Sequence, residues 1–80
     1  MNIVIIHGLL SLLTKDESGV IYGNLNVFSL WNDIPFTFTT NVEELPGSGT
    51  LEVGSYVVLH GTLDHDRTGI QILVTSYAVM

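Results

Sequence analysis

The sequence contains no cysteine and few charged residues, and both absences limit what the chain can be. Without cysteine it has no disulfide and no thiolate metal site. Charged residues make up 12% of its 80 residues, whereas an average soluble protein has about 25%. A single domain of this size buries only about 60–65% of its unfolded surface, so we expect oligomerisation to supplement its core.

Basic residues are almost absent as well. Lys15 and Arg67 are the two positive side chains, and the formal net charge is −6. Nucleic-acid-binding proteins draw much of their affinity from basic side chains that neutralise phosphates. The overall field of this chain therefore opposes contact with DNA, RNA and anionic membranes.

Long apolar runs are also missing, since no stretch approaches the roughly 18 consecutive residues of a membrane-spanning helix. The apolar segment Ile3–Ile6 has neither a cationic region before it nor a small-residue cleavage pattern after it, so we expect no secretion signal and a soluble, cytoplasmic protein. Hydrophobic residues nevertheless make up 46% of the chain. This content predicts an exposed apolar patch of the kind that contacts a partner.

Five segments have the composition and period of β-strands. Ile34–Thr40, for example, alternates apolar and polar residues, and Pro35 is expected near the start of its strand or on an edge because it lacks an N–H. The predicted strands are Ile3–Leu13, Val20–Trp31, Ile34–Thr40, Ser55–Leu63 and Ile70–Val79.

The connections are predicted from turn-forming residues. Asn32-Asp33 is predicted to be a tight turn, and Asp64–Gly69 a hairpin loop. Asn41 is expected to cap a single turn over Val42–Leu45, and no amphipathic pattern is long enough for a real helix. Five strands with at most one short helical turn between the third and fourth predict an all-β, five-stranded OB-fold Greek-key barrel over residues 1–80.

Two segments, Val4–Leu10 and Val57–Leu63, are similar, and each has a His-Gly pair after apolar residues. We interpret them as strands with similar local roles, in which glycine marks a bulge or a bend. If Val57, Leu59 and Leu63 point inward, so do Val4, Ile6 and Leu10. The outward set of the first strand is then Ile3, Ile5, His7 and Leu9. Because a strand that is apolar on both faces is usually covered on both, we predict that this set forms the interface of a dimer or tetramer.

Several segments, in order, resemble the bacterial and phage single-stranded-DNA-binding family. The best match is Val53–Leu63, which is similar to the family's Lys-Gly-Ser followed by apolar residues and Gly-Arg-Leu. Other similar segments are Met1–Leu10, Ser18-Gly19 with Asn26–Leu30, Asp33–Phe36 and Gly69–Ala78. The chain departs from that family where Leu9 and Thr62 replace arginine, Val53 replaces lysine and Thr39 replaces tryptophan.

The resemblance implies binding of single-stranded nucleic acid by stacking of bases on aromatic side chains. The candidate platforms are Trp31, Tyr56, Tyr22 and Phe28, with Lys15 and Arg67 as phosphate contacts. With so little basic charge, such binding is expected to be weak at physiological salt or to occur within a complex. The alternative is a non-catalytic assembly domain that has lost DNA binding and whose acidic surface meets a basic protein.

No residue pattern predicts catalysis, a cofactor or a metal site. Gly47-Ser48-Gly49 lacks the lysine and the helix of a phosphate loop, and no nucleophile arrangement is present. The three histidines lack tight ligand spacing, and Asp64-His65-Asp66 is equally an ordinary polar turn. If His7 and His60 pack in a subunit interface, their protonation near pH 6 is expected to weaken assembly.

Overall fold

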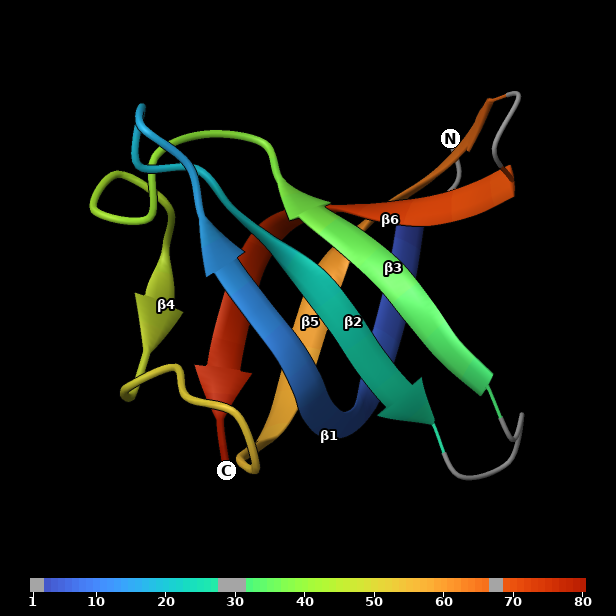
Figure 1. The fold of residues 1–80 in the computed structure, drawn as a ribbon, viewed down its shortest axis with the longest axis horizontal. Helices are drawn as coiled ribbons and strands as arrows, with labels where there is room; N and C mark the ends of the chain where they lie inside the picture. Colours follow the sequence, from blue (N-terminus) through green and yellow to red (C-terminus); the bar gives the residue numbers. More distant parts are fainter. Residues whose placement is uncertain (1–2, 28–31, 67–68) are drawn as a thin grey trace.

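The computed structural model describes residues 3–27, 32–66 and 69–80, and it forms one sheet of six strands that curls on itself (Figure 1). The strands are β1 (Ile3–Lys15), β2 (Ile21–Val27), β3 (Asn32–Phe38), β4 (Gly47–Ser48), β5 (Tyr56–Asp66) and β6 (Gly69–Val79). Their order is β3-β2-β1-β5-β6-β4. None of the described residues forms a helix, and none therefore forms one with the length and apolarity that a membrane crossing requires.

A parallel pairing between β3 and β6 closes the sheet into a barrel. This pairing joins Phe36 to Ile72 and Phe38 to Val74. The pairs β1–β2, β2–β3 and β5–β6 are antiparallel. The two-residue strand β4 lies outside this ring, against the end of β6. The five longer strands thus form the closed barrel of an OB-fold, which confirms the predicted fold class.

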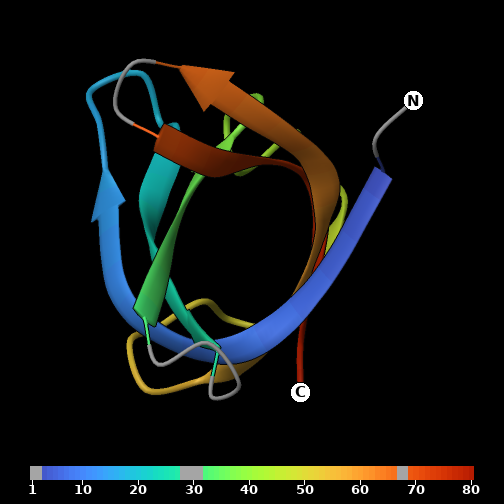
Figure 2. The ribbon, with the colours of Figure 1, turned by 90° about the vertical axis from the view of Figure 1, so that its right-hand side faces the viewer.

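Strand β1 is strongly curved and belongs to both halves of the barrel (Figure 2). Its first part, Ile3–Leu9, pairs with β5, and its second part, from Leu9 to Lys15, pairs with β2. The two similar segments of the sequence are partners in the first pairing, with Val4 opposite Gly61. In this antiparallel ladder the glycine of each segment lies opposite the first valine of the other, Gly61 opposite Val4 and Gly8 opposite Val57.

The core is built from inward residues of the five longer strands and from Leu45 in the connection after β3. It consists of Leu10, Ile21, Leu25, Phe36, Phe38, Leu45, Val57, Leu59, Ile72 and Val74. Val4 and Ile6 pack against this cluster, as predicted from strand parity. Leu63 is also predicted to point inward, but the predicted burial is wrong, because 42% of its surface is exposed. The described β1–β5 ladder begins at the pair Ile3–Thr62, so Leu63 lies beyond its end.

Two predicted turns overlap with strands. Asn32 and Asp33 begin β3 and pair with Val27 and Asn26, so the predicted tight turn there is wrong. The predicted loop Asp64–Gly69 is also wrong in its bounds, because the β5–β6 ladder continues to the pair Asp66–Gly69. In both places the ladder of backbone hydrogen bonds overrides the turn preference of the side chains. The predicted end of the second strand, residues 28–31, lies outside the described residues.

The connection between β3 and β5 folds over one end of the barrel. The Asn41 carbonyl oxygen accepts hydrogen bonds from the N–H groups of Glu44 at 2.9 Å and Leu45 at 3.1 Å, which forms a single turn. The Asn41 side-chain oxygen accepts from the Glu43 N–H at 2.9 Å, which confirms the predicted cap. The turn places Leu45, 5% exposed, in the core.

Candidate functional site

The first half of β1 has a strand on one side only. Ile3–Leu9 pairs with β5, whereas pairing with β2 begins at Leu9, so no described strand lies along the second edge of residues 3–8. Backbone groups point to alternate sides along a strand, and the Leu10 N–H donates toward β5, to the Ser55 carbonyl oxygen at 2.8 Å. The backbone N–H and C=O of Ile3, Ile5 and His7 therefore point to the open edge.

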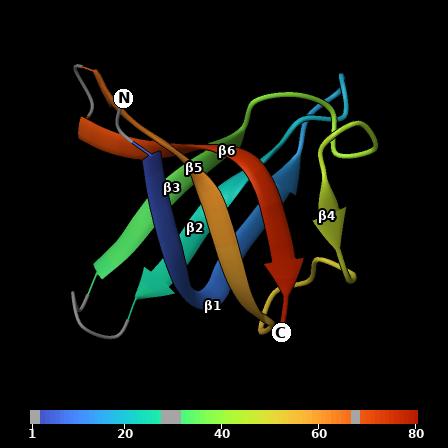
Figure 3. The same ribbon diagram turned by 180° about the vertical axis from the view of Figure 1, so that it is seen from behind.

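The side chains along this edge are mostly apolar, and three of the four are exposed. Ile3 is 67% exposed and Ile5 is 64% exposed, His7 is exposed, and Leu9 is half-buried. The predicted outward parity of these four residues is therefore confirmed. Opposite them on β5 stand Thr62, His60, Val58 and Tyr56. Figure 3 shows this half of β1 lying beside β5. The pair of strands thus presents an outward face without an acidic or a permanently charged basic side chain over these positions.

Tyr56 belongs to this face. The His7 Nδ1 atom and the Tyr56 hydroxyl oxygen are 2.6 Å apart, and the two ring centroids are separated by 5.7 Å. Tyr56 has the outward parity that the sequence predicts, but its ring is half-buried and its hydroxyl is engaged by His7. A base that stacks on Tyr56 would have to lie on the β1–β5 face.

Tyr22 lies on a different part of the barrel. It is 43% exposed on β2, opposite Thr37 of β3. Along the same side of β2 and β3 follow Asn24, Pro35 and Asn26, and the Asn26 Nδ2 donates to the Asp33 carboxylate at 3.0 Å. This outward β2–β3 face is therefore polar, with a single described aromatic ring and no described basic side chain.

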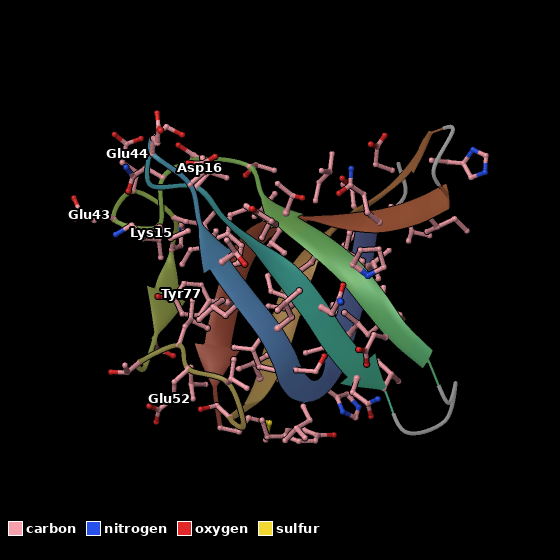
Figure 4. All side chains as sticks on the ribbon, in the orientation of Figure 1. Lys15, Asp16, Glu43, Glu44, Glu52 and Tyr77 are labelled. Atoms are coloured by element: carbon pink, nitrogen blue, oxygen red, sulfur yellow. The ribbon has the colours of Figure 1, made fainter. Side chains whose placement is uncertain are left out.

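The structure does not bring the predicted nucleic-acid contacts together. Tyr22 is level with Thr14 on β1 and Tyr56 is level with Leu9, so a bent length of strand separates them. Lys15 lies at the end of the barrel that carries Asp16, Glu43 and Glu44 (Figure 4), which makes that end unfavourable for a phosphate. Trp31, Phe28 and Arg67 lie outside the described residues.

The remaining described aromatic side chains are part of the interior or its border. Phe36 and Phe38 are each 2% exposed, with ring centroids 6.0 Å apart. Tyr77 stacks on Phe38 at 5.5 Å and lies close over Gly47. These three rings stabilise the barrel and leave Tyr22 as the exposed platform of the described residues.

Asp16 adds a fixed negative charge at the acidic end. Its Oδ1 accepts hydrogen bonds from the Ser18 hydroxyl at 2.6 Å, the Ser18 N–H at 2.9 Å and the Val20 N–H at 3.0 Å. These bonds, led by the one from the Ser18 hydroxyl, lower the pKa of the Asp16 carboxyl below its ordinary value. This carboxylate therefore stays ionised at mildly acidic pH.

The histidines do not gather into a ligand set. His7 and His60 lie diagonally across the β1–β5 pair, whereas His65 lies near the far end of β5. Within the described parts of the chain, no three histidine, aspartate or glutamate side chains lie close enough together to hold a metal ion.

Comparison with known proteins adds no relative: no family model matches the chain, and no curated protein is significantly similar in sequence. The class of this protein is therefore defined only by its fold and its surfaces: it is an OB-type barrel with an open β1 edge. The resemblance to single-stranded-DNA-binding proteins stays a prediction.

Proposed function

We propose that this chain is a non-catalytic assembly domain that joins a second copy through the open edge of β1. The observation that supports this proposal is that the backbone groups of Ile3, Ile5 and His7 face an open edge where Ile3 and Ile5 expose apolar side chains. Edge strands that must stay single usually carry charges, proline or a bulge. Ile3–Gly8 carries no charge and no proline, and its pairing with β5 is regular.

The charge distribution favours the same edge. A net charge of −6 makes two copies repel each other in most orientations. Four of the eight acidic side chains, Asp16, Glu43, Glu44 and Glu52, lie on the side of the barrel away from the start of β1 (Figure 4), whereas Asp64 of β5 lies two residues beyond the partner of Ile3. Contact through β1 thus keeps those four carboxylates of the two copies apart.

A two-fold axis gives this edge a self-complementary partner. Antiparallel pairing centred on Ile5 places Ile5 opposite the same residue of the partner subunit, and His7 opposite Ile3 of the partner subunit. The backbone groups that point to the open edge then bond to each other, and the two sheets become continuous.

The test is the association state of three proteins, measured by sedimentation velocity at tens of micromolar. We expect the wild type to be a dimer and Ile5→Lys to be a monomer, because the ammonium would be placed in the contact. Leu12→Lys is the matched control, since Leu12 is 48% exposed on the half of β1 that β2 covers. It should remain a dimer. A monomeric wild type at this concentration contradicts the proposal.

A second candidate function is weak binding of single-stranded nucleic acid, which the exposure of Tyr22 on the β2–β3 face favours. OB-fold proteins bind oligonucleotides across their second and third strands. A stacked base contributes about 1–3 kcal/mol without basic charge. Tyr22 supplies one such contact, so the affinity would be low.

This candidate is tested by titrating oligo-dT at low salt while Trp31 fluorescence is followed. Saturable quenching that weakens with salt, disappears in Tyr22→Ala and persists in Tyr22→Phe supports it, because phenylalanine keeps the stacking ring. The absence of any response at hundreds of micromolar oligonucleotide contradicts it as an activity of this chain alone.

A further inference from the structure

Two imidazoles flank the centre of the proposed β1 contact. His60 stands directly opposite Ile5, and His7 stands opposite Val58, so the histidines are diagonal neighbours on one outward face. Diagonal positions across an antiparallel pair are roughly 7–8 Å apart. Both side chains are exposed in the single chain, where water solvates either protonation state.

The strands around these imidazoles offer little to balance a positive charge. Within Ile3–Leu9 of β1 and along β6 there is no carboxylate and no basic side chain other than His7 itself, and the other titratable group is the Tyr77 phenol. On β5, Asp64 lies two outward positions beyond His60, and its Oδ2 accepts a hydrogen bond from Gln71 at 3.3 Å. Protonation of both histidines therefore places two cations side by side without a dedicated carboxylate.

The described acids of the neighbouring segments are also not paired with His7 or His60. Asp33, one strand beyond Asn26 of β2, already accepts the hydrogen bond of the Asn26 amide. Glu52 is exposed in the connection before β5. The neutral polar side chains of the same face are Tyr56 and Thr62 of β5 and Ser76 of β6, which lies opposite His60.

The bond between His7 and Tyr56 also depends on protonation. When the imidazole is neutral with its proton on Nε2, Nδ1 accepts the hydrogen bond that the Tyr56 hydroxyl donates over 2.6 Å. A proton on Nδ1 turns this atom into a donor, and the hydroxyl must rotate to accept. Acid thus changes both the charge of the face and the orientation of its Tyr56 hydroxyl.

We propose that the β1 assembly is acid-labile, because protonation of His7 and His60 separates the two copies. This inference rests on the assembly proposed above. In the pairing centred on Ile5, each His7 faces Ile3 of the partner subunit, and removing an imidazolium from water into an apolar contact is unfavourable. Imidazole ordinarily changes its charge between pH 5 and 8, so assembly holds at pH 7.5 and weakens at pH 5.5.

The direction of this effect is diagnostic. Protonation of the three histidines changes the formal net charge from −6 to −3, since −6 + 3 = −3. General repulsion between copies therefore decreases in acid, and the net charge alone predicts tighter association at pH 5.5. Only groups inside the contact produce the opposite trend.

The experiment measures the dimer dissociation constant at pH 7.5 and 5.5 by sedimentation equilibrium. For the wild type we expect this constant to rise about tenfold for each imidazole whose protonation the contact excludes. The double variant His7→Gln/His60→Gln should show no such rise. His65→Gln is the matched control, because His65 is an exposed histidine of the same β5 strand. It should respond to pH as the wild type does.

Each other outcome is decisive. A wild-type dimer that is equally tight at both pH values, or a double variant that weakens as much as the wild type, overturns acid lability but leaves the assembly intact. A wild type that is monomeric at both values overturns the assembly and this inference together. Circular dichroism at pH 5.5 verifies the fold. If the double variant does not fold, His60→Gln alone should reduce the rise without abolishing it, whereas His65→Gln should leave the rise unchanged.

Discussion

The side-chain amide of Asn41 donates a hydrogen bond of 2.9 Å to the carbonyl oxygen of Ser18. Ser18 belongs to the turn between β1 and β2, and Asn41 follows β3, so this bond fastens two connections to each other. The Val42 N–H donates to the Gly19 carbonyl oxygen beside it, at 3.1 Å. Together these bonds hold the turn that delivers Leu45 to the core.

Replacing Asn41 by alanine should lower the free energy of unfolding by about 1–2 kcal/mol, since both the cap to Glu43 and the bond to Ser18 are lost. Chemical denaturation measures the change. Asn41→Asp is the matched variant, because it keeps an acceptor for the Glu43 N–H and loses the donor to Ser18. Its stability should lie between the other two, and an Asn41→Ala protein as stable as the wild type contradicts this account.

Asp16 should contribute stability that depends on pH in a defined direction. Its hydrogen bonds lower the pKa of the folded carboxyl below the ordinary value of 3.8, with the Ser18 hydroxyl as the largest cause. The contribution is therefore present above the unfolded pKa and is lost as the pH falls through the folded pKa. Titration by NMR should show that Ser18→Ala raises the Asp16 pKa toward its ordinary value. An unchanged pKa in that variant shows that the hydroxyl is not the main cause.

Gly61 should not tolerate a side chain. A Cβ at this position would collide with the carbonyl oxygen of Leu73, and the next nearest atoms are also backbone. Overpacking of this kind typically destabilises by about 1–3 kcal/mol, which a lower midpoint of thermal unfolding would reveal in Gly61→Ala. Gly54 has open space around it but a φ of 96°, so Gly54→Ala should lose about 1 kcal/mol through backbone strain alone. A Gly61→Ala protein with the stability of Gly54→Ala contradicts the packing argument.

Leu45 should behave as a core residue although it lies in a connection. It is 5% exposed, so Leu45→Ala should lose about 2–5 kcal/mol of unfolding free energy. Leu12→Ala removes the same atoms from a side chain that is 48% exposed and should lose much less. Equal losses in the two variants would mean that the connection does not cover the barrel end.

The sequence predicts the local parts of this fold well. Strand parity indicates that Ile3, Ile5 and His7 face outward, and the capping preference of Asn41 identifies the turn after β3. Turn propensity misleads at Asn32-Asp33 and Asp64–Asp66, because pairing with the neighbouring strand outweighs it at these positions. There the long-range ladder decides, and local composition does not report it.

The open edge of β1 cannot be predicted from any local sequence pattern. It exists because the pairing of β1 changes from β5 to β2 at Leu9, which is a property of the whole topology. The similarity of Val4–Leu10 to Val57–Leu63 shows neither that these segments pair nor what lies on the other side of β1. Likewise, the outward parity of Tyr56 does not reveal that His7 engages its hydroxyl.

The parallel pairing of β3 with β6 also has a consequence for how the chain reaches its native state. β6 bonds to β3, β4 and β5, yet it follows all of them in the sequence. A nascent chain whose β6 is still in the ribosome cannot close the barrel. The edges of β3 and β5 that pair with β6 are then unpaired. Because contacts between distant segments form slowly, folding should take milliseconds to seconds. The barrel can close only after β6 has been synthesised, and until then the unpaired strands are accessible to chaperones.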